Sequence, residues 1–310
     1  MILDFLDFLK INDIDYRLTN GYKDIFVNEI NKDSDHDILF KKNDFLKIDS
    51  IIKDFCRKHN SMIVQVYHQE LLAKNFFIYN RESCELLNLD LYGEVSRKGI
   101  TILDENRTFK LVNSYKGISI LTPHQEFIHY LIKKIDKQVI NKTTFDYLCD
   151  LYNKDNKGCN IQLDLFFKKT SKLISNLFID KNFLLFNEKL FKFKEDFLKN
   201  KKENVINKVS NYLRVFKRVL KPTGITICFL GPDGSGKSTI IDCLLNKTLP
   251  FRRNDYFHLK PITVNKLSSG KVVNNPHASP PYSKIKSFIK LGYYFFLYNI
   301  GWIKNVFPIK

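Results

Sequence analysis

At 310 residues the chain is long enough for two domains, and an apolar content of 44% argues against wholesale disorder. Its six cysteines are scattered without a Cys-x-x-Cys pair, which excludes a disulfide or zinc framework and is typical of a reducing compartment. Asp4 and Asp7 stand where an export signal needs a basic start and an unbroken apolar run, so we expect a cytoplasmic protein. The net charge of +17 is compatible with a nucleic-acid partner, but its distribution along the chain does not favour one.

The first 120 residues alternate between helical and strand patterns. An amphipathic helix is predicted over residues 1–12, and Asn20-Gly21 is typical of the turn that follows a first strand. A second helix is predicted over Phe45–His59. The predicted strands are Tyr16–Thr19, Asp35–Phe40, Met62–His68, Asn75–Tyr79, Glu85–Tyr92, Ile100–Leu103 and Phe109–Val112.

Three aspartates lie on two of these strands. Asp35 and Asp37 are two residues apart, and the period of a strand places both on one face. Within Glu85–Tyr92 leucines alternate with polar residues, which places Asp90 on the polar side of a second strand. Because carboxylate oxygens are ligands that Mg²⁺ prefers, the three predict a divalent metal site. The alternative is that they are ordinary acids at strand ends.

The run Ser34–Leu39, together with this order of elements, resembles the nucleotidyltransferase fold of the DNA polymerase beta superfamily. The resemblance implies that two close acids and a later third hold Mg²⁺ for nucleotidyl transfer. In that family a Gly-Ser turn precedes the acids, and its serine helps to grip the triphosphate. Here Gly21 is followed by Tyr22 at the corresponding spacing, so the serine has no counterpart.

Residues 121–221 are predicted to form a helical connector. Thr122-Pro123-His124-Gln125 has the threonine cap, early proline and third-position glutamine of a helix start. His124 and His129 are expected to pack or lie at the surface rather than to bind metal. Further helices are predicted over Thr144–Tyr152, around Phe166–Phe178 and over Val205–Leu220.

The end of this connector is strongly basic. Residues 181–221 contain twelve Lys or Arg and four Asp or Glu, a net charge of +8. The simplest interpretation is a solvated helical face, and an anionic membrane surface or an anionic substrate is the alternative. Nucleic acid is not favoured as a partner, because the segment has no arginine-rich motif and no interleaved aromatic platform.

Nine residues, Gly231–Thr239, match the phosphate-binding pattern G-x-x-x-x-G-K-[ST]. The apolar run Ile225–Leu230 predicts a buried parallel strand before the loop, and Lys237–Lys247 predicts a helix after it. Glycines let successive N–H groups point at a phosphate, and the helix N-terminus adds partial positive charge. We expect ATP to bind at Gly231, Gly234, Ser235, Gly236, Lys237, Ser238 and Thr239.

Two of these residues have expected roles in the chemistry of a bound nucleoside triphosphate. Lys237 is expected to reach the β- and γ-phosphates, and the Ser238 hydroxyl to ligate Mg²⁺. With Asp233 inside it, the loop also resembles the thymidylate kinase group of P-loop kinases. That resemblance implies that the loop acid lies near the sugar of the acceptor nucleotide. Asp233 and Lys237 are therefore the candidate catalytic residues, and a role for Asp233 in bracing the loop is the alternative.

The chain as a whole is similar to bacterial fused proteins that are often associated with surface-polysaccharide gene clusters. These have a nucleotidyltransferase-like N-terminal part, a helical middle and a thymidylate-kinase-like C-terminal part. Thymidylate-kinase-like domains continue into an Asp-Arg strand and an arginine-rich lid, which cannot be assigned here. One further strand is predicted at Asp255–Leu259, and residues 283–303 predict an apolar helix that can favour self-association. We therefore expect a truncated P-loop domain with slow turnover, if any.

Together these patterns predict an α/β protein in three parts. They are a nucleotidyltransferase-like domain over residues 1–120, a helical connector over 121–221 and an incomplete P-loop domain over 222–310. The favoured function is Mg²⁺-assisted phosphoryl transfer from ATP to a small phosphorylated acceptor, a nucleotide or a sugar phosphate. The alternatives are metal-dependent nucleotidyl transfer at Asp35, Asp37 and Asp90, and a non-catalytic nucleotide-binding assembly protein.

Overall fold

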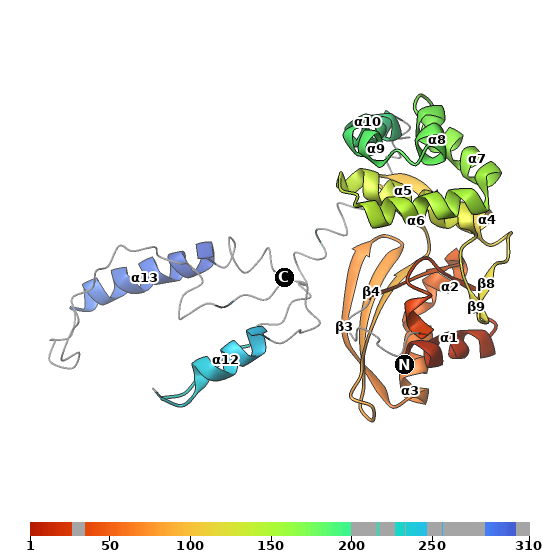
Figure 1. The fold of residues 1–310 in the computed structure, drawn as a ribbon. Coiled ribbons are helices and arrows are strands. Elements are labelled where there is room, and N and C mark those ends of the chain that lie inside the picture. The colour runs from red at the N-terminus through yellow and green to blue at the C-terminus, as the bar shows by residue number, and fades with distance from the viewer. Residues whose placement is uncertain are drawn as a thin grey trace. The chain divides into compact units, whose positions relative to one another are not determined.

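The computed structural model describes residues 1–26, 35–199, 227–232, 234–246 and 283–301, together with Phe216 and Tyr256. The chain divides into two compact units, residues 1–217 and 218–310. The fold is mixed α/β, as predicted, and its main sheet is mixed parallel and antiparallel (Figure 1). Within the described part of the chain, no helix is both long enough and apolar enough to cross a membrane.

A five-stranded sheet forms the framework of the first unit. Its strand order is β1-β2-β5-β4-β3. β2 and β5 are parallel neighbours, and the other three pairs are antiparallel. The bounds confirm the sequence pattern closely: β1 Tyr16–Leu18, β2 Asp35–Phe40, β3 Ser61–Glu70, β4 Ala73–Asn80 and β5 Leu86–Tyr92.

The two faces of this sheet differ in character because side chains alternate along each strand. On β2, Ile38 and Phe40 belong to a buried cluster that also includes Phe5 of α1 (Ile2–Ile11) and Phe55 of α3 (Ile48–Lys58). The short helix α2 (Lys42–Leu46) precedes α3. The other face carries Asp35 and Asp37, followed by Leu39, which packs in a second cluster. A polar face is thus left beside the buried one.

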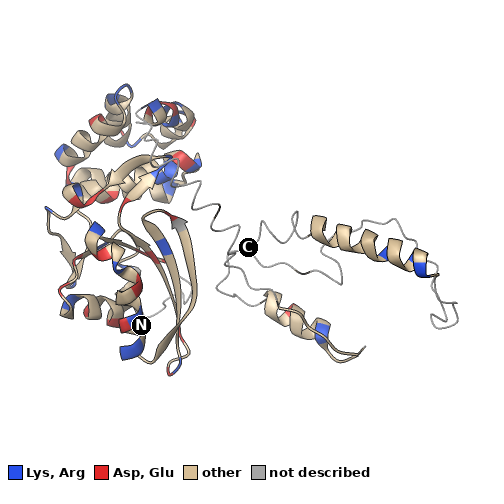
Figure 2. Ribbon diagram, turned by 180° about the vertical axis from the view of Figure 1, so that it is seen from behind, with Lys and Arg blue, Asp and Glu red and all other residues tan. Residues whose placement is uncertain are grey.

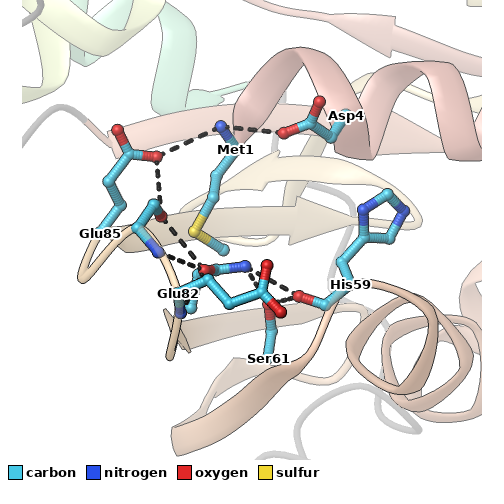
Figure 3. Close-up of polar contacts among 8 residues, drawn as sticks. Met1, Asp4, His59, Ser61, Glu82 and Glu85 are labelled. Carbon is cyan, nitrogen blue, oxygen red and sulfur yellow. Dashed lines mark hydrogen bonds and ion pairs between the residues drawn. The ribbon is translucent and has the colours of Figure 1, made fainter.

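The N-terminal amino group links α1 to the far end of the sheet. It lies 3.2 Å from Asp4 Oδ2 and 3.5 Å from Glu85 Oε2, in the turn between β4 and β5 (Figure 3). In the same turn Asn80 Oδ1 accepts hydrogen bonds from the backbone N–H groups of Glu82 and Ser83. These contacts connect the start of α1 with the strand connection that brings Asp90 into the sheet.

Short elements follow the sheet, and one prediction is wrong here. No strand forms over Phe109–Val112. Asp104 caps a one-turn helix instead, and a hairpin forms beyond it around Lys116 and Gly117, whose φ angles are 47° and 83°. Such a tight turn fixes which residues can pair. The elements are η1 Asp24–Phe26, β6 Val95–Arg97, β7 Ile100–Leu103, α4 Glu105–Thr108, β8 Ser114–Tyr115 and β9 Ile118–Ser119.

Six described helices follow, and their buried side chains form one core cluster with Leu39 of the sheet (Figure 1). The Thr122–Gln125 capping box is present, and it confirms the predicted helix start. The single helix predicted around Phe166–Phe178 is instead two helices. The Asp196 carboxylate accepts the N–H groups of Lys169 and Thr170, both at 2.9 Å, and so stabilises the break. The helices are α5 Pro123–Lys137, α6 Lys142–Lys154, α7 Asn156–Phe166, α8 Ser171–Ile179, α9 Phe183–Glu188 and α10 Leu190–Lys199.

Two helices are described in the second unit. α12 (Lys237–Asn246) confirms the predicted P-loop helix, and α13 (Lys284–Gly301) confirms the late apolar helix. In Figure 2 the lysines of α13 gather toward one end, and the rest of the helix is uncharged. Its aromatic residues are mostly exposed, for example Phe288 at 78% and Phe295 at 73%. Self-association through this helix stays a prediction.

The prediction of a strand before the P-loop is wrong for the part of that segment that the structure describes. Ile227–Leu230 has no regular secondary structure, and Ile227 and Leu230 are 64% and 89% exposed. A parallel strand needs neighbours for its backbone groups, and no described residue of this unit belongs to a strand. The strand at Asp255–Leu259 and the helix over Val205–Leu220 fall on segments of which only Tyr256 and Phe216 are described.

Candidate functional site

The P-loop is held in a curl by its own lysine. The Lys237 ammonium donates to the carbonyl oxygens of Gly231 and Pro232, at 2.7 and 2.5 Å, and lies 3.3 Å from the Ser235 hydroxyl. The first residue of α12 therefore reaches back across the loop to the residues where it begins. Asp233, the proposed acceptor-side acid, lies outside the described residues.

Glycines allow the backbone of this loop to turn. Gly234 and Gly236 have φ angles of 79° and 78°, a region that side chains with a Cβ enter at a cost. At Gly231 the constraint is space, because an added Cβ would lie 2.8 Å from the Ser235 hydroxyl. The first helical hydrogen bond runs from the Ile240 N–H to the Gly236 carbonyl, at 3.1 Å. The loop thus closes directly into a helix N-terminus.

This geometry suits a phosphate. The ammonium of Lys237 donates to carbonyl oxygens, which carry no net charge. An anion such as a phosphate is a stronger partner for a cation than these neutral groups are. Ser238 and Thr239 stand exposed in the first turn of α12, where the helix dipole favours negative charge. A hydroxyl next to a phosphate site is the ligand by which P-loop proteins hold Mg²⁺, and Ser238 is in that position. The residues present therefore fit a nucleoside triphosphate with Mg²⁺.

The three acids predicted from the sequence lie on the polar face of the main sheet. Asp37 on β2 and Asp90 on β5 are direct register partners, and Asp35 pairs with Asn88 in the same ladder. Asp37 and Asp90 are buried, with 7% and 8% exposed, whereas Asp35 is exposed. The predicted alternation on β5 is confirmed, since Leu87, Leu89 and Leu91 lie in the apolar core.

A continuous chain of hydrogen bonds runs through this row. Asn20 Nδ2 donates to Asp37 Oδ2 at 2.7 Å, and the Tyr92 hydroxyl is 3.0 Å from Asp37 Oδ1 and 3.3 Å from Asp90 Oδ2. The Asn75 amide donates to Asp90 Oδ1 and, at 2.7 Å, to Asn88 Oδ1. The Asn88 amide in turn donates to Asp35. We call these residues the acid row: Asn20, Asp35, Asp37, Asn75, Asn88, Asp90 and Tyr92.

Cationic and neutral side chains of α5 lie against the acid row. The Lys133 ammonium is 3.6 Å from Asp37 Oδ2, and the Lys133 side chain is 24% exposed. One turn earlier, burial lowers the pKa of His129 to about 4, and the nearby charge of Lys133 acts in the same direction. Burial, then the charges of Asp37 and Asp90, raises the pKa of Tyr92 well above its ordinary value. At neutral pH the imidazole is therefore uncharged and the phenol keeps its proton.

The acid row as it lies does not fit a divalent cation. Asn20 and Asn75 each donate to one carboxylate oxygen of Asp37 and Asp90 respectively, and the Tyr92 hydroxyl, with its single proton, lies within hydrogen-bond distance of the other oxygen of each. The Asp35 carboxylate is bonded to the Asn88 amide rather than gathered with the other two. Among the described residues, no group of three or more His, Cys, Asp or Glu side chains is placed to hold a metal ion.

Tyr22, which follows Gly21 in the turn after β1, has a packing role. Tyr22 is buried, and its hydroxyl lies 3.3 Å from Glu126 Oε2, while Tyr147 donates to the other oxygen of the same carboxylate. Burial raises the pKa of Tyr22 to about 12, so that the phenol remains a donor. The turn after β1 is thus connected to α5 and α6 through the buried Tyr22 side chain.

Sequence reasoning missed several members of the acid row. Tyr92 could have been found, because it continues the polar alternation of Asn88 and Asp90. Asn75 stands opposite Asp90 on β4, a pairing that requires the strand register. Lys133 lies on a helix far along the chain, and no local pattern connects it with Asp37.

No protein-family model matches the chain, and neither a curated protein nor a solved structure does. The functional argument therefore depends on the P-loop and the acid row themselves.

Proposed function

We propose that the second unit binds the phosphates of ATP at Gly231–Thr239 and, with Mg²⁺, acts as a phosphotransferase of the thymidylate kinase type. The acceptor would be a small phosphorylated molecule, a nucleotide or a sugar phosphate. The observation that carries the proposal is the bonding of the Lys237 ammonium to the carbonyl oxygens of Gly231 and Pro232. This bonding supports the interpretation that the loop already curves around the position that a phosphate would take.

Different residues of the loop would bind different parts of the nucleotide and its metal ion. Lys237 would leave its two carbonyl partners for the terminal phosphates, because an ammonium is attracted more strongly to an anionic oxygen than to a neutral one. Backbone N–H groups between Gly234 and Thr239 would meet the remaining phosphate oxygens. Ser238 would hold Mg²⁺, which neutralises charge on the transferred phosphoryl group when it is bound. Asp233 is proposed to face the acceptor.

The test is calorimetric titration of the full chain with Mg²⁺ and ATP. Lys237→Ala removes a charge-assisted contact worth about 1.5–3 kcal/mol, and the affinity should fall roughly tenfold or more. Lys284→Ala on α13 removes an equal charge from a helix outside the loop and should leave the affinity unchanged. An unchanged affinity in a folded Lys237→Ala variant would refute the assignment of the loop.

Turnover assays separate the remaining hypotheses. ADP release with a panel of nucleoside monophosphates and sugar phosphates would indicate phosphoryl transfer. Pyrophosphate release would indicate nucleotidyl transfer at Asp35, Asp37 and Asp90, the alternative that the hydrogen-bonded state of these acids does not favour. ATP binding without either product would support the nucleotide-binding assembly protein.

A further inference from the structure

The pair Asp37 and Asp90 has a cationic neighbour and a bridging donor of its own. From the positions of these groups we infer that Lys133 and Tyr92 together occupy the place of a divalent cation in the acid row. The row consequently binds no such cation in this chain. The inference concerns the first unit and is independent of the P-loop proposal.

Tyr92 fills the position between the two carboxylates. Its hydroxyl is 3.0 Å from Asp37 Oδ1 and 3.3 Å from Asp90 Oδ2, the facing oxygens of two register partners. A cation shared by these carboxylates would have to bind to the same two oxygens. Since Tyr92 stands two residues after Asp90 on the same face of β5, the strand itself holds the hydroxyl there.

Lys133 supplies positive charge at the outer oxygen of the pair. Its ammonium lies 3.6 Å from Asp37 Oδ2, which also accepts the Asn20 amide at 2.7 Å. Two carboxylates side by side in a buried position repel each other, and a nearby positive charge offsets that repulsion. A divalent cation added beside the ammonium would be repelled by it, so the lysine and the metal are alternatives rather than partners.

The helix around Lys133 holds the side chain in place. Its neighbours Ile132 and Ile135 are fully buried in the helical core, and Asp136 on the next turn pairs with Arg97 at 3.3 Å and Lys194 at 3.3 Å. These pairings occupy the Asp136 carboxylate, the nearest acid along the helix. Lys133 is thus directed to the sheet, where Asp37 is its partner.

The inference predicts that removing both groups creates a metal site. We would titrate the full chain with Mn²⁺ by calorimetry, without nucleotide, in the wild type, Lys133→Met and the double variant Lys133→Met/Tyr92→Phe. Methionine keeps most of the apolar stem of the lysine, and phenylalanine keeps the ring. Asp37→Asn is added to each of these three proteins. The part of the binding heat that this substitution removes comes from Mn²⁺ bound at the acid row. Lys134→Met, next along α5 and bonded to no acid-row residue, is the matched control.

The expected result is at least tenfold tighter Mn²⁺ binding in the double variant than in the wild type, lost again when Asp37→Asn is added. Lys134→Met should behave as the wild type. A Mn²⁺ site in the wild type that Asp37→Asn removes would overturn the inference, and that measurement needs no variant at Lys133. A double variant that circular dichroism shows to be folded, and that gains no site, would overturn it equally. If the double variant does not fold, the single variant Lys133→Met is titrated in its place. A gain of Mn²⁺ affinity that Asp37→Asn removes would support the inference, and a folded Lys133→Met variant without such a gain would overturn it.

Discussion

Asp37 and Asp90 face each other directly across two parallel strands, and a single phenol, that of Tyr92, reaches both carboxylates. Parallel neighbours carry matched residues on the same face, so the spacing within β2 and β5 alone brings the acids together. The same face is covered by α5, which contributes Lys133. The acids are therefore part of a polar network between the sheet and the helices. Substitutions that disrupt this network should lower the free energy of unfolding.

Tyr92→Phe should destabilise the first unit. The substitution removes a hydroxyl that donates to one of two buried carboxylates within reach and leaves the ring in place, so the loss should be about 1.5–3 kcal/mol of unfolding free energy. Urea unfolding followed by circular dichroism measures it. Tyr130→Phe on α5 is the control, because the described contacts of Tyr130 are those of its ring. Equal losses in the two variants would argue against the Tyr92 bridge.

Stability should fall as the pH is lowered from about 6.5 to about 4. Burial lowers the pKa of His36 to about 4, and burial lowers that of His129 to the same range, whereas both titrate near 6.5 in the unfolded chain. Below 6.5 the unfolded state therefore binds more protons, and the contribution of each neutral histidine is lost progressively toward pH 4. A shift of this size corresponds to roughly 3 kcal/mol for each group.

Urea unfolding across this pH range measures the effect on stability. Replacement of His36 and His129 by glutamine should flatten the dependence, since glutamine does not titrate. His36 packs on the α1 side of β2 and His129 on the helical side, so the two substitutions should contribute separately. An unchanged slope in the double variant would show that other groups are responsible for it.

Gly158→Ala should destabilise α7, although alanine normally favours a helix by about 1 kcal/mol over glycine. An added Cβ would lie 2.3 Å from Asp155 Oδ2, so the aspartate would have to move. It would then lose its cap on the Gly158 N–H, at 2.9 Å, and its contact with His124 Nδ1, at 2.6 Å. Loss of such a cap costs about 1 kcal/mol or more. A melting temperature above that of the wild type would contradict this account.

Local patterns predicted most of the first unit correctly. The Thr122–Gln125 box identified a helix start because its hydrogen bonds join residues close in sequence. The leucines of β5 identified a buried face in the same way. The resemblance to nucleotidyltransferases stays a prediction, since no comparison tests it.

What could not be predicted depends on contacts between distant residues. The break between α7 and α8 is fixed by Asp196, which lies on α10. Lys133 reaches Asp37 only because the helices cover one face of the sheet. The strand expected at Ile225–Leu230 was inferred from composition, but a strand exists only where a neighbour pairs with it. Each of these outcomes is set by tertiary structure rather than by the local sequence.

Gly236→Ala should weaken ATP binding without disturbing α12. The φ angle of Gly236 is 78°, and an added Cβ would meet nothing within 4 Å, so backbone strain alone opposes the substitution. A left-handed conformation costs a residue with a Cβ roughly 1–2 kcal/mol, and a loop that relaxes this strain would turn its N–H groups away from the phosphates. The affinity should therefore fall roughly fivefold to thirtyfold.

The control is Gly292→Ala within α13. Its added Cβ also meets nothing within 4 Å, and the residue lies in ordinary helical backbone, so ATP affinity should be unchanged. Calorimetric titration of both variants decides the matter: equal affinities would mean that the curl at Gly236 has no part in binding the nucleotide.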